Sequence, residues 1–492
     1  MNSISSRVFS SAAFLLGAQL VQRSLGLIST LVLARLLTPE HFGVVALVAI
    51  ALQFFDILAD AGNQHYIIHK PAVQDHDLNT AWTIDLIVKT VVYGVIVLCT
   101  PALTTFFETP ELTSALPIAA LALPIRALRN PAMMLWAKEL NYRPSFMLTL
   151  WAKVISFVTV ITWALIDPGY WALIAGSLVS ILVVAIGSYR LSDYRPKPAL
   201  NRFREQWTFS RWVILRGLTG FTRSQIDNLV VSRLFGTTGL GGYHLVRELA
   251  TFPAVSVIIP GSEPLQAAIA ESHQRPADLA YRLRLSQFMM ISLLTPITAY
   301  MMFDAELIVT VLLGTSWAEY APLLRPFGLY FFTFCLFALV SDAFLAIGRV
   351  KALFVFDLIS TCIILSILVT LSEPTLETLA WVRGWLAVIT TAALMVQLNQ
   401  VTAFGLTHTM LLSLPVCAAT ALGLLIVCQI QPYTINLAWS LLTLLINGGL
   451  FCLAFATLVV PIILALRHRV AEFNHIIGPA IKLLNGKKNQ GG

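Results

Sequence analysis

Several charged residues lie in the middle of apolar stretches long enough to cross a membrane, and these residues are the strongest candidates in the sequence for a chemical role. A charged side chain at the centre of a bilayer costs roughly 2.5–3.5 kcal/mol on insertion scales, so each such residue needs a function or a partner. Arg and Lys at this depth are at least as numerous as the acids, which favours an anionic ligand. The candidate ligand-binding residues are Arg23, Lys89, Arg126, Arg129, Arg216 and Arg223.

Position within each stretch separates the stronger candidates from the weaker ones. Arg23 and Arg126 lie near mid-span, where the side chain cannot easily reach the membrane surface, so they favour a cavity. Arg129 follows Arg126 by three residues and would share its helix face. Lys153 fits a cavity and a surface-reaching position equally well.

Two pairs of opposite charge admit a structural interpretation as well as a cavity. Asp85 and Lys89 lie four residues apart and could neutralise each other near a span end. Arg223 and Asp227 have the same spacing and could form an ion pair that holds a helix in place. Arg216 precedes them by about two turns and can lie on their face.

The acidic residues at depth are candidates for ion coupling. Asp56 and Asp60 lie one helical turn apart, and two carboxylates this close resist double ionisation, so one proton should be held. Coupling to protons or sodium needs such a site. A break in the helix at residues 60–63 is the alternative, and the sequence does not decide between coupling and flow down the cargo gradient. The candidates are Asp56, Asp60, Asp85 and Asp227.

Composition excludes several classes of function. The chain is 57% hydrophobic and 12% charged, against roughly 25% charged residues in soluble domains. Basic runs with interleaved aromatic residues are absent, so we expect no nucleic-acid partner. We also expect no metal site and no cofactor, because the metal-compatible spacing of His65 and His69 is better explained as a polar span end.

The elements that must position these residues are about fourteen membrane spans. At about 20 residues per span, the apolar stretches account for most of the chain. We place them at residues 9–37, 43–68, 81–106, 115–136, 146–166, 171–190, 208–235, 242–269, 282–308, 322–346, 352–371, 376–399, 409–430 and 438–466. In residues 242–269, Pro253, Pro260 and Pro264 predict a kink or a break.

The connections between spans alternate in charge. One set carries the Lys and Arg residues, and the other carries acids but no Lys or Arg. Basic connections face the cytoplasm in membrane proteins. This bias predicts a multi-pass protein with both termini in the cytoplasm and an even number of spans.

An internal repeat organises the spans. The segment at residues 33–43 matches the segment at 231–241 with an offset of 198 residues, which aligns Arg35 with Arg233 and Gly43 with Gly241. An even number of spans per copy makes the repeat parallel. The predicted organisation is a six-helix lobe (1–195), a second six-helix lobe (205–400), two extra helices (405–466) and a basic cytoplasmic tail (467–492). The two extra helices, which carry no charge, could face lipid or an oligomer partner.

With this plan the chain resembles the lipid-linked oligosaccharide flippases, or polysaccharide exporters, of the multidrug/oligosaccharidyl-lipid/polysaccharide transporter superfamily. The resemblance rests on Leu-Ala-Arg-Leu-Leu-Thr-Pro-Glu-His-Phe-Gly at residues 33–43, on Gln-Ile-Asp-Asn at 225–228, on Ser-Arg-Leu-Phe-Gly at 232–236 and on Leu-Gly-Gly-Tyr at 240–243. It extends over nearly the whole chain in its span plan.

The resemblance implies two six-helix lobes around a central cavity that opens alternately to the two sides of a bacterial inner membrane. It implies a cargo of undecaprenyl-diphosphate-linked sugars, moved from the cytoplasmic to the periplasmic leaflet for lipopolysaccharide, exopolysaccharide or capsule. Polysaccharide polymerase and export machinery are the implied partners. Arginine suits such a diphosphate because its planar fork can bond two oxygens at once.

Three alternatives differ from this hypothesis in identifiable ways. A membrane glycosyltransferase or polymerase should display carboxylates on a sizeable outer loop, and the outer loops here are short. A drug exporter for cations should line its cavity with acids and aromatic residues. A lipid II-type flippase differs only in the sugar. We therefore expect a transporter and not an enzyme.

Overall fold

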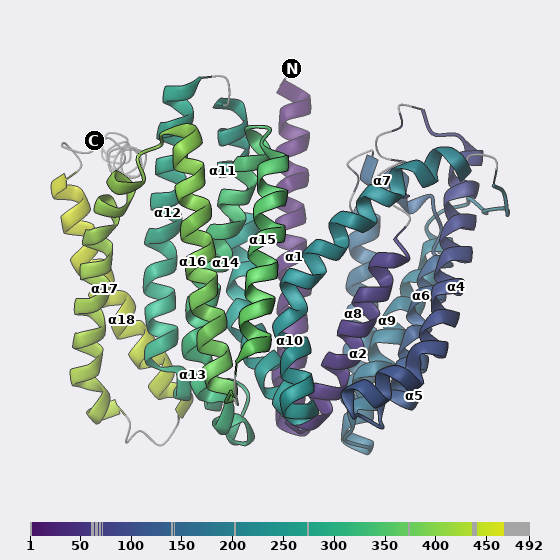
Figure 1. Ribbon diagram of the computed structural model, residues 1–492, viewed down its shortest axis with the longest axis horizontal. Coiled ribbons are helices and arrows are strands. Elements are labelled where there is room, and N and C mark those ends of the chain that lie inside the picture. Colours follow the sequence, from purple (N-terminus) through teal and green to yellow (C-terminus); the bar gives the residue numbers. More distant parts are fainter. Residues whose placement is uncertain are drawn as a thin grey trace, which may run out of the picture. The chain divides into compact units, whose positions relative to one another are not determined.

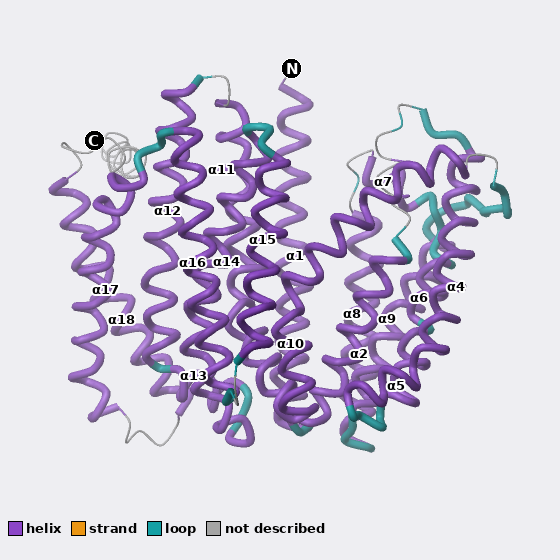
Figure 2. Tube along the Cα trace, in the orientation of Figure 1, coloured by secondary structure: helices purple, strands orange, loops and turns teal. Residues whose placement is uncertain are grey.

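In the computed structural model, all the regular elements of the described residues are helices (Figure 1). Figure 2 shows these helices joined by loops, with no strands among the described residues. The structure describes residues 2–60, 63, 67, 70, 72–138, 141, 143–200, 203–272, 275–371, 374–434 and 440–466, with only the helix backbone over 2–16 and 203–216. Contacts divide the chain into two compact units. Unit 1 is Met1–Glu248 with Asp357–Leu376, and unit 2 is Leu249–Phe356 with Glu377–Gly492.

Unit 1 contains the helices of the first part of the chain and the second part of α15. Its elements are α1 (Asn2–Leu36), α2 (Pro39–Leu58), α4 (Asp75–Phe107), α5 (Leu112–Ala120), α6 (Ala122–Ala127), α7 (Met133–Lys138), α8 (Arg143–Ile166), α9 (Tyr170–Arg190), α10 (Phe203–Pro253) up to Glu248, and α15 (Val350–Thr370) from Asp357.

Unit 2 contains the remaining helices. Its elements are the end of α10, a π-helix (Ala254–Ile258), α11 (Ile259–Ser272), α12 (Pro276–Phe303), α13 (Ala305–Leu312), a 3₁₀-helix (Thr315–Leu323), α14 (Leu324–Ala346), the start of α15, α16 (Leu376–Thr402), α17 (Leu406–Thr434) and α18 (Ser440–Leu466).

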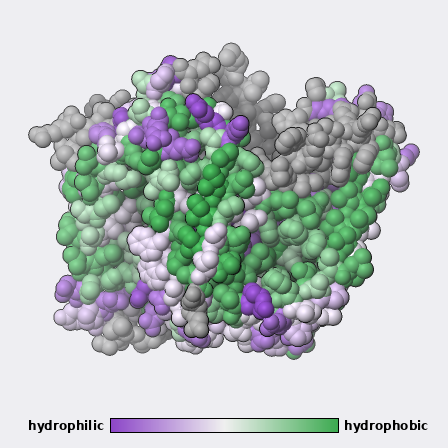
Figure 3. All heavy atoms as spheres, viewed as in Figure 1, coloured by the Kyte–Doolittle hydropathy of each residue, from purple (hydrophilic) through white to green (hydrophobic). Residues whose placement is uncertain are grey.

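Many of the described helices are long enough to span a membrane. Eleven stretches are long and apolar enough to cross a bilayer, and Figure 3 shows apolar side chains along the helices with hydrophilic residues gathered at their ends. One of the eleven, Gly217–Ser272, is divided by a turn into two helices, which correspond to two of the expected spans. The shorter apolar helix Leu112–Ala127 and the 35-residue α1 occupy two more of the expected positions. The expected all-helical polytopic fold class is confirmed.

The expected span at residues 115–136 is instead divided into the short helices α5, α6 and α7. A proline ring clashes with the carbonyl group four residues earlier in a helix. Pro124 lies four residues after Ala120, where α5 ends, and Pro131 lies four residues after Ala127, where α6 ends. The two prolines therefore account for both interruptions, which the hydropathy pattern alone does not reveal.

The turn between α1 and α2 follows from the local sequence of the repeat motif. Thr38 is the N-cap of α2, and its side chain accepts a hydrogen bond from the backbone N–H of His41 at 3.5 Å. Pro39 occupies the first helical position, where its missing N–H has no intrahelical role. Glu40 places a negative charge in the first turn, which favours the helix N-terminus.

The equivalent turn in the second motif interrupts α10. Gly236 has φ 64° and ψ −165°, a backbone conformation that residues with a Cβ rarely adopt. Here the chain reverses, so α10 consists of two helices that lie against each other. The interruption lies within the connection predicted at residues 236–241 but is confined to Gly236, since residues 237–241 are already helical, and it brings residues from both sides of the turn together.

The two repeat motifs contact each other reciprocally in unit 1. A Cβ built on Gly43 would lie 1.7 Å from the backbone oxygen of Thr237, and one on Gly241 would lie 1.8 Å from the backbone oxygen of Pro39. The offset of 198 residues relates Gly43 to Gly241 and Pro39 to Thr237, so the two contacts are equivalent. The paired backbones approach so closely that only glycine fits at both positions.

The proline-rich segment after α10 does not break the helix but forms a π-helix, whose turns are wider than those of an α-helix. Pro253 ends α10, and residues Ala254–Ile258 form a π-helix before α11. The N–H of Ile259 bonds the carbonyl of Ala254, five residues earlier. Pro260, which follows Ile259, has no N–H and cannot donate the next helical hydrogen bond. Helix irregularities commonly occur at prolines and at π-helical turns. The predicted irregularity is thus located in unit 2.

The last two helices form a hairpin that packs within unit 2. Phe288 on α12 lies in a buried cluster with Leu412, Val416, Ala419 and Val459 of the hairpin. At one end of α12, Asp304 accepts hydrogen bonds from the side-chain amides of Gln431 at 3.2 Å and Asn447 at 3.4 Å. Tyr300 donates to the Leu444 carbonyl at 3.2 Å and stacks on Phe451. The side chain of Asn447, on α18, is therefore buried and hydrogen-bonded inside unit 2.

Asp304 should make stability depend on pH. Burial raises the pKa of its carboxyl group, and nearby donors such as the Asn447 amide oppose the rise only in part. The folded protein then holds this proton more tightly than the unfolded chain, so stability should fall as pH rises from the ordinary carboxyl value through the raised pKa. We expect the melting temperature in detergent to increase as the pH is lowered across this range.

The Asp304→Asn variant should lose that increase, because asparagine is neutral at every pH. The control is Asp278→Asn, which changes an exposed carboxyl group at the other end of α12 and should keep the pH dependence. An unchanged slope in Asp304→Asn would show that other groups cause it.

Candidate functional site

Four of the predicted site residues line one small polar cavity in unit 1. The cavity has a volume of about 50 Å³ and is bounded by α4, by α6 and by the segment that follows α6. We call it the cationic pocket and define it by Asp85, Lys89, Arg126 and Arg129. Trp82 and Met134 are among its other lining residues. Spacing in the sequence predicted each pair separately, but only the fold brings the two pairs to one place.

Acidic residues neutralise two of the three cations in the pocket. Lys89 forms an ion pair with Asp85 at 3.1 Å on α4. Arg126 forms an ion pair with Asp56 of α2 at 2.5 Å. Asp85 also accepts a hydrogen bond at 2.9 Å from the amide of Asn63, which is buried. The expected Asp85–Lys89 pair is therefore present, and it belongs to a larger group of charges.

Arg129 is the third cation of the pocket. Within the described ranges, no residue forms an ion pair or a hydrogen bond with its guanidinium group. Asp85 attracts its charge and Arg126 repels it. The pocket thus holds three cations and one anion of its own, with Asp56 contributing a second anion from α2. These three cations therefore exceed the two acids by one positive charge.

Local structure explains how the cations are positioned. Asp85 and Lys89 lie one turn apart on the same face of α4. Arg126 lies in the last turn of α6, where a positive charge interacts favourably with the helix C-terminus. Arg129 follows in the turn before Pro131. The breaks at Pro124 and Pro131 therefore place both arginines on short elements near α4 rather than along one long span.

The second-copy residues Arg223 and Asp227 each have a partner on another segment. Arg223 on the first half of α10 forms an ion pair with Asp357 of α15. Asp227 forms an ion pair at 2.7 Å with Arg247, which lies beyond the Gly236 turn. The spacing of four residues predicted a pair between Arg223 and Asp227 themselves. The chain reversal at Gly236 and the approach of α15 supply partners that spacing within one helix cannot show.

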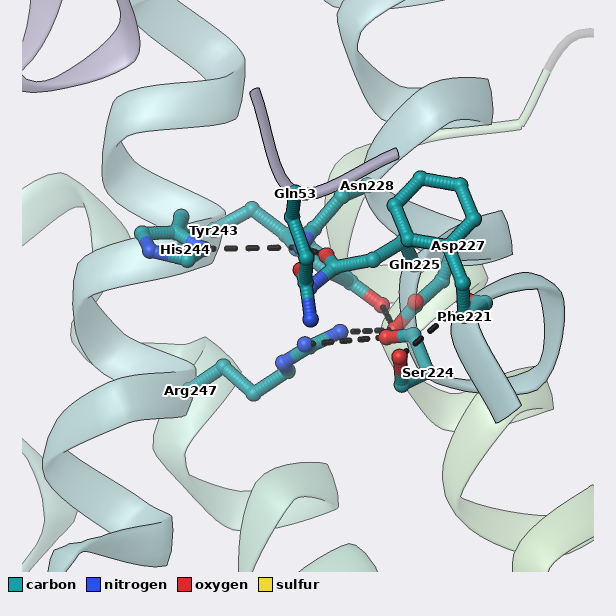
Figure 4. A network of polar contacts seen from close by, with 9 residues as sticks. All are labelled: Gln53, Phe221, Ser224, Gln225, Asp227, Asn228, Tyr243, His244 and Arg247. Carbon is teal, nitrogen blue, oxygen red and sulfur yellow. Dashed lines mark hydrogen bonds and ion pairs between the residues drawn. The ribbon is translucent and has the colours of Figure 1, made fainter. Parts of the chain in front are cut away.

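The Asp227–Arg247 pair lies in a buried polar network (Figure 4). Asp227 is fully buried, and it also accepts a hydrogen bond from the Tyr243 hydroxyl at 3.1 Å. Arg247 donates a second hydrogen bond to the Ser224 carbonyl at 3.1 Å. A carboxylate with this number of donors is well suited to hold the two halves of α10 together.

Three amide side chains continue this network toward α2. Gln225 donates to the side-chain oxygen of Gln53 at 2.7 Å, and Asn228 donates to the side-chain oxygen of Gln225 at 2.7 Å. Asn228 is fully buried beside His244, whose Nδ1 lies 3.4 Å from the Asn228 amide nitrogen. We call Gln53, Gln225 and Asn228 the amide chain. It joins α10 to the face of α2 that also carries Asp56.

The remaining predicted residues have different positions. Arg23 is exposed on α1, and within the described chain it has no ion pair. Asp60 lies beyond α2, which ends at Leu58, so Asp56 and Asp60 do not share one helix. The predicted break near residues 60–63 is consistent with this helix end. The side chain of Arg216 and the residues His65 and His69 lie outside the described part of the chain.

Sequence reasoning missed several residues that the structure places at these sites. Asp357 lies in mid-span, so the criterion of charge at membrane depth could have identified it. Gln53 and Asn63 are neutral, and nothing in their spacing indicates a role. In the described residues, no group of three or more His, Cys, Asp or Glu could hold a metal ion.

A family model decides the relationship. Residues 32–322, more than half of the chain, match the family described as polysaccharide biosynthesis protein. The chain belongs to that family. Succinoglycan biosynthesis transport protein ExoT of Rhizobium meliloti is 29% identical to this family member over 306 residues, 60% of each protein. Lipopolysaccharide biosynthesis protein WzxC of Escherichia coli is 22% identical over 331 residues, 66% of each.

Solved structures show the fold of this polysaccharide biosynthesis protein. It is similar to lipid II flippase MurJ in an inward closed conformation, with a TM-score of 0.69, 12% identity and coverage of 92% of this chain and 98% of MurJ. An inward-facing multidrug resistance MATE family transporter of the MOP superfamily has a TM-score of 0.60, 14% identity and coverage of 77% and 95%. The family match confirms the expected relationship to polysaccharide biosynthesis proteins, and the solved structures show the fold.

Proposed function

We propose that this protein flips an undecaprenyl-diphosphate-linked oligosaccharide from the cytoplasmic to the periplasmic leaflet of a bacterial inner membrane. The product would serve lipopolysaccharide, exopolysaccharide or capsule synthesis, with polysaccharide polymerase and export machinery as partners. The alternation of basic and acidic connections supports an orientation with both termini in the cytoplasm. The names of ExoT and WzxC support a carbohydrate cargo and a transport step.

One observation carries the proposal, which is the cationic pocket with an arginine that has no ion-pair partner among the described residues. A diphosphate offers several oxygen acceptors and negative charge, and arginine can bond two such oxygens in one plane. In a membrane protein an unneutralised cation is costly unless a ligand or water compensates it. Arg129 therefore suits the diphosphate, whereas a cationic drug would be repelled by the same charge.

The two ion pairs in the pocket suggest how the empty and loaded protein differ. With no cargo, Asp85 and Asp56 neutralise Lys89 and Arg126. The side chains of Arg126 and Asp56 are 44% and 36% exposed, so an entering phosphate can compete for Arg126. We propose that the diphosphate first contacts Arg129 and then draws Lys89 and Arg126 toward it. Such an exchange of partners would bias the protein between its inward-open and outward-open states.

The other sequence candidates keep their proposed roles without a shared pocket. Arg23, Arg216 and Arg223 remain predicted cargo contacts. Proton or sodium coupling through Asp56, Asp60, Asp85 and Asp227 remains a prediction, and the ion pairs of Asp56 and Asp85 would make their charge depend on cargo. The organisation into two six-helix lobes, two extra helices and a basic tail also remains a proposal.

The Arg129→Gln variant tests the function directly. Purified protein in proteoliposomes should flip a lipid-linked diphosphate sugar, and the variant should do so about 10- to 100-fold more slowly, because hydrogen bonds to charged groups contribute roughly 1.5–3 kcal/mol. Lys153→Gln is the matched control, since Lys153 is exposed on membrane-length α8 and does not line the pocket. Equal rates in both variants would contradict the pocket as the diphosphate site.

Three further outcomes address the alternatives. Formation of new glycosidic bonds by the purified protein would indicate a membrane glycosyltransferase or polymerase. Transport of organic cations with no flipping of lipid diphosphates would indicate a drug exporter. Flipping of lipid II in preference to other lipid-linked sugars would retain the diphosphate site and change only the glycan.

A further inference from the structure

We propose that the amide chain forms a subsite for hydroxyl groups of the sugar next to the diphosphate, with Gln53 as the contact residue. This inference rests on the proposed function, because it assigns a second part of the same cargo. It differs from the cationic pocket in chemistry, since the amides are neutral and can both donate and accept hydrogen bonds.

The end of the amide chain is open to a ligand. The oxygen atoms of Gln53 and Gln225 accept hydrogen bonds from the next amide along, so the chain runs from buried Asn228 to exposed Gln53. Among the described residues, nothing bonds to the amide nitrogen of Gln53. Gln53 therefore presents two N–H donors from a side chain whose oxygen is already held in place. Figure 4 shows Gln53 together with the buried groups that support it.

Half-buried Gln225 and buried Asn228 support the side chain of Gln53. Asn228 is fully buried, and its side-chain oxygen has no hydrogen-bond partner in the described chain. Its amide nitrogen bridges Gln225 and His244. Phe54, next to Gln53, contacts Phe221 with ring centres 5.5 Å apart, which fixes α2 against α10. The donors of Gln53 are thus held before any ligand arrives, which lowers the entropic cost of binding.

The position of Gln53 connects it to the cationic pocket. Gln53 and Asp56 lie three residues apart on α2, and side chains at this spacing are neighbours on one helix face. Asp56 is the partner of Arg126, which lines the pocket. A cargo with its diphosphate at Arg126 and Arg129 would therefore carry its first sugar toward the Gln53 side of Asp56.

A lipid-facing role for Gln53 is physically unfavourable. An amide group in hydrocarbon without hydrogen-bond partners costs several kcal/mol. Since two donors of exposed Gln53 are unused by the described residues, the group must face water or a polar ligand. Hydroxyl groups of a sugar are acceptors and donors at once and match a planar amide. The subsite would thus favour uncharged hydroxylated sugars.

The experiment compares two probes that differ only in the sugar. Binding of undecaprenyl diphosphate and of undecaprenyl-diphosphate-hexose to the purified protein in detergent can be measured by native mass spectrometry or by thermal shift. We expect Gln53→Leu to weaken binding of the hexose-bearing lipid about tenfold, because one or two hydrogen bonds contribute on the order of 1.4 kcal/mol. Binding of the sugar-free lipid should not change.

Controls separate this subsite from the proposed function and from misfolding. Gln400→Leu replaces an exposed glutamine on α16 and should leave both affinities unchanged. Arg129→Gln should weaken both lipids by the same factor. If Gln53→Leu proves unstable, Gln53→Asn can replace it. That variant shortens the same side-chain amide and should lose part of the affinity for the hexose-bearing lipid. Equal weakening of both lipids by Gln53→Leu, or no weakening, would overturn the subsite, whereas a wild-type protein that binds neither lipid would overturn the proposed function.

Discussion

The Gly43→Ala variant should lose about 3 kcal/mol or more of its free energy of unfolding, at the upper end of what overpacked sites lose. The added Cβ would lie 1.7 Å from the oxygen and 2.5 Å from the carbon of the Thr237 backbone. Backbone atoms cannot turn aside as a side-chain tip can, so α2 would have to move away from α10. Thermal or chemical unfolding of the purified protein in detergent measures the loss.

The internal repeat sharpens this prediction. Gly241→Ala would meet the backbone oxygen of Pro39 at 1.8 Å, and the repeat relates this contact to the one at Gly43. The two variants should therefore lose similar amounts of stability. One displacement of α2 relieves both clashes, so the double variant should lose less than the sum of the two.

The matched control is Gly94→Ala on α4. A Cβ at Gly94 would have no atom within 4 Å, and alanine is favoured over glycine inside a helix by roughly 0.5–1 kcal/mol. This variant should be as stable as the wild type or slightly more stable. Equal melting temperatures for Gly43→Ala and Gly94→Ala would refute the close contact of the two motifs.

The second large effect is expected when Arg247 is removed from Asp227. Arg247→Met should cost about 3–5 kcal/mol, because it leaves the carboxylate of Asp227, 0% exposed, without its cationic partner. The double variant Asp227→Asn, Arg247→Met should recover much of that loss, since removal of both charges removes the penalty for burying one. Unfolding in detergent, combined with yield in the membrane fraction, measures both variants.

An exposed ion pair of the same helix provides the control. Arg233 pairs with Glu108 at 2.9 Å, and the two side chains are 48% and 70% exposed. Arg233→Met should cost no more than about 1 kcal/mol, as is usual for exposed pairs. If Arg247→Met were as stable as Arg233→Met, the Asp227–Arg247 pair would not have the inferred structural role.

Local patterns predicted the elements of the fold. Apolar length reports a membrane span because every span must bury about 20 residues in lipid. The spans placed at residues 208–235 and 242–269 predicted a connection between them, and the chain reverses there at Gly236. Prolines predicted the irregular segment after α10, but the breaks at Pro124 and Pro131 were missed because the hydropathy of residues 115–136 is continuous.

The candidate site was predicted only in part. Charge at membrane depth identified Lys89, Arg126 and Arg129, because a buried charge is costly wherever it occurs. The same rule applied to residue 357 would have found the partner of Arg223. Neutral amides carry no such signal, so Gln53 was missed.

By itself the sequence determined that this protein is a polytopic helical membrane protein with an internal sequence repeat and with Arg and Lys at least as numerous as acids at membrane depth, because length, hydropathy and charge are properties of each segment alone. Only the tertiary structure decided which charges meet. Arg126 finds Asp56 across 70 residues of chain, and Arg223 finds Asp357 across 134. Such partners depend on which helices lie side by side, and the periodicity within one helix does not show which helices are its neighbours. For the same reason, the lack of an ion pair at Arg129 within the described chain became visible only once the helices were placed.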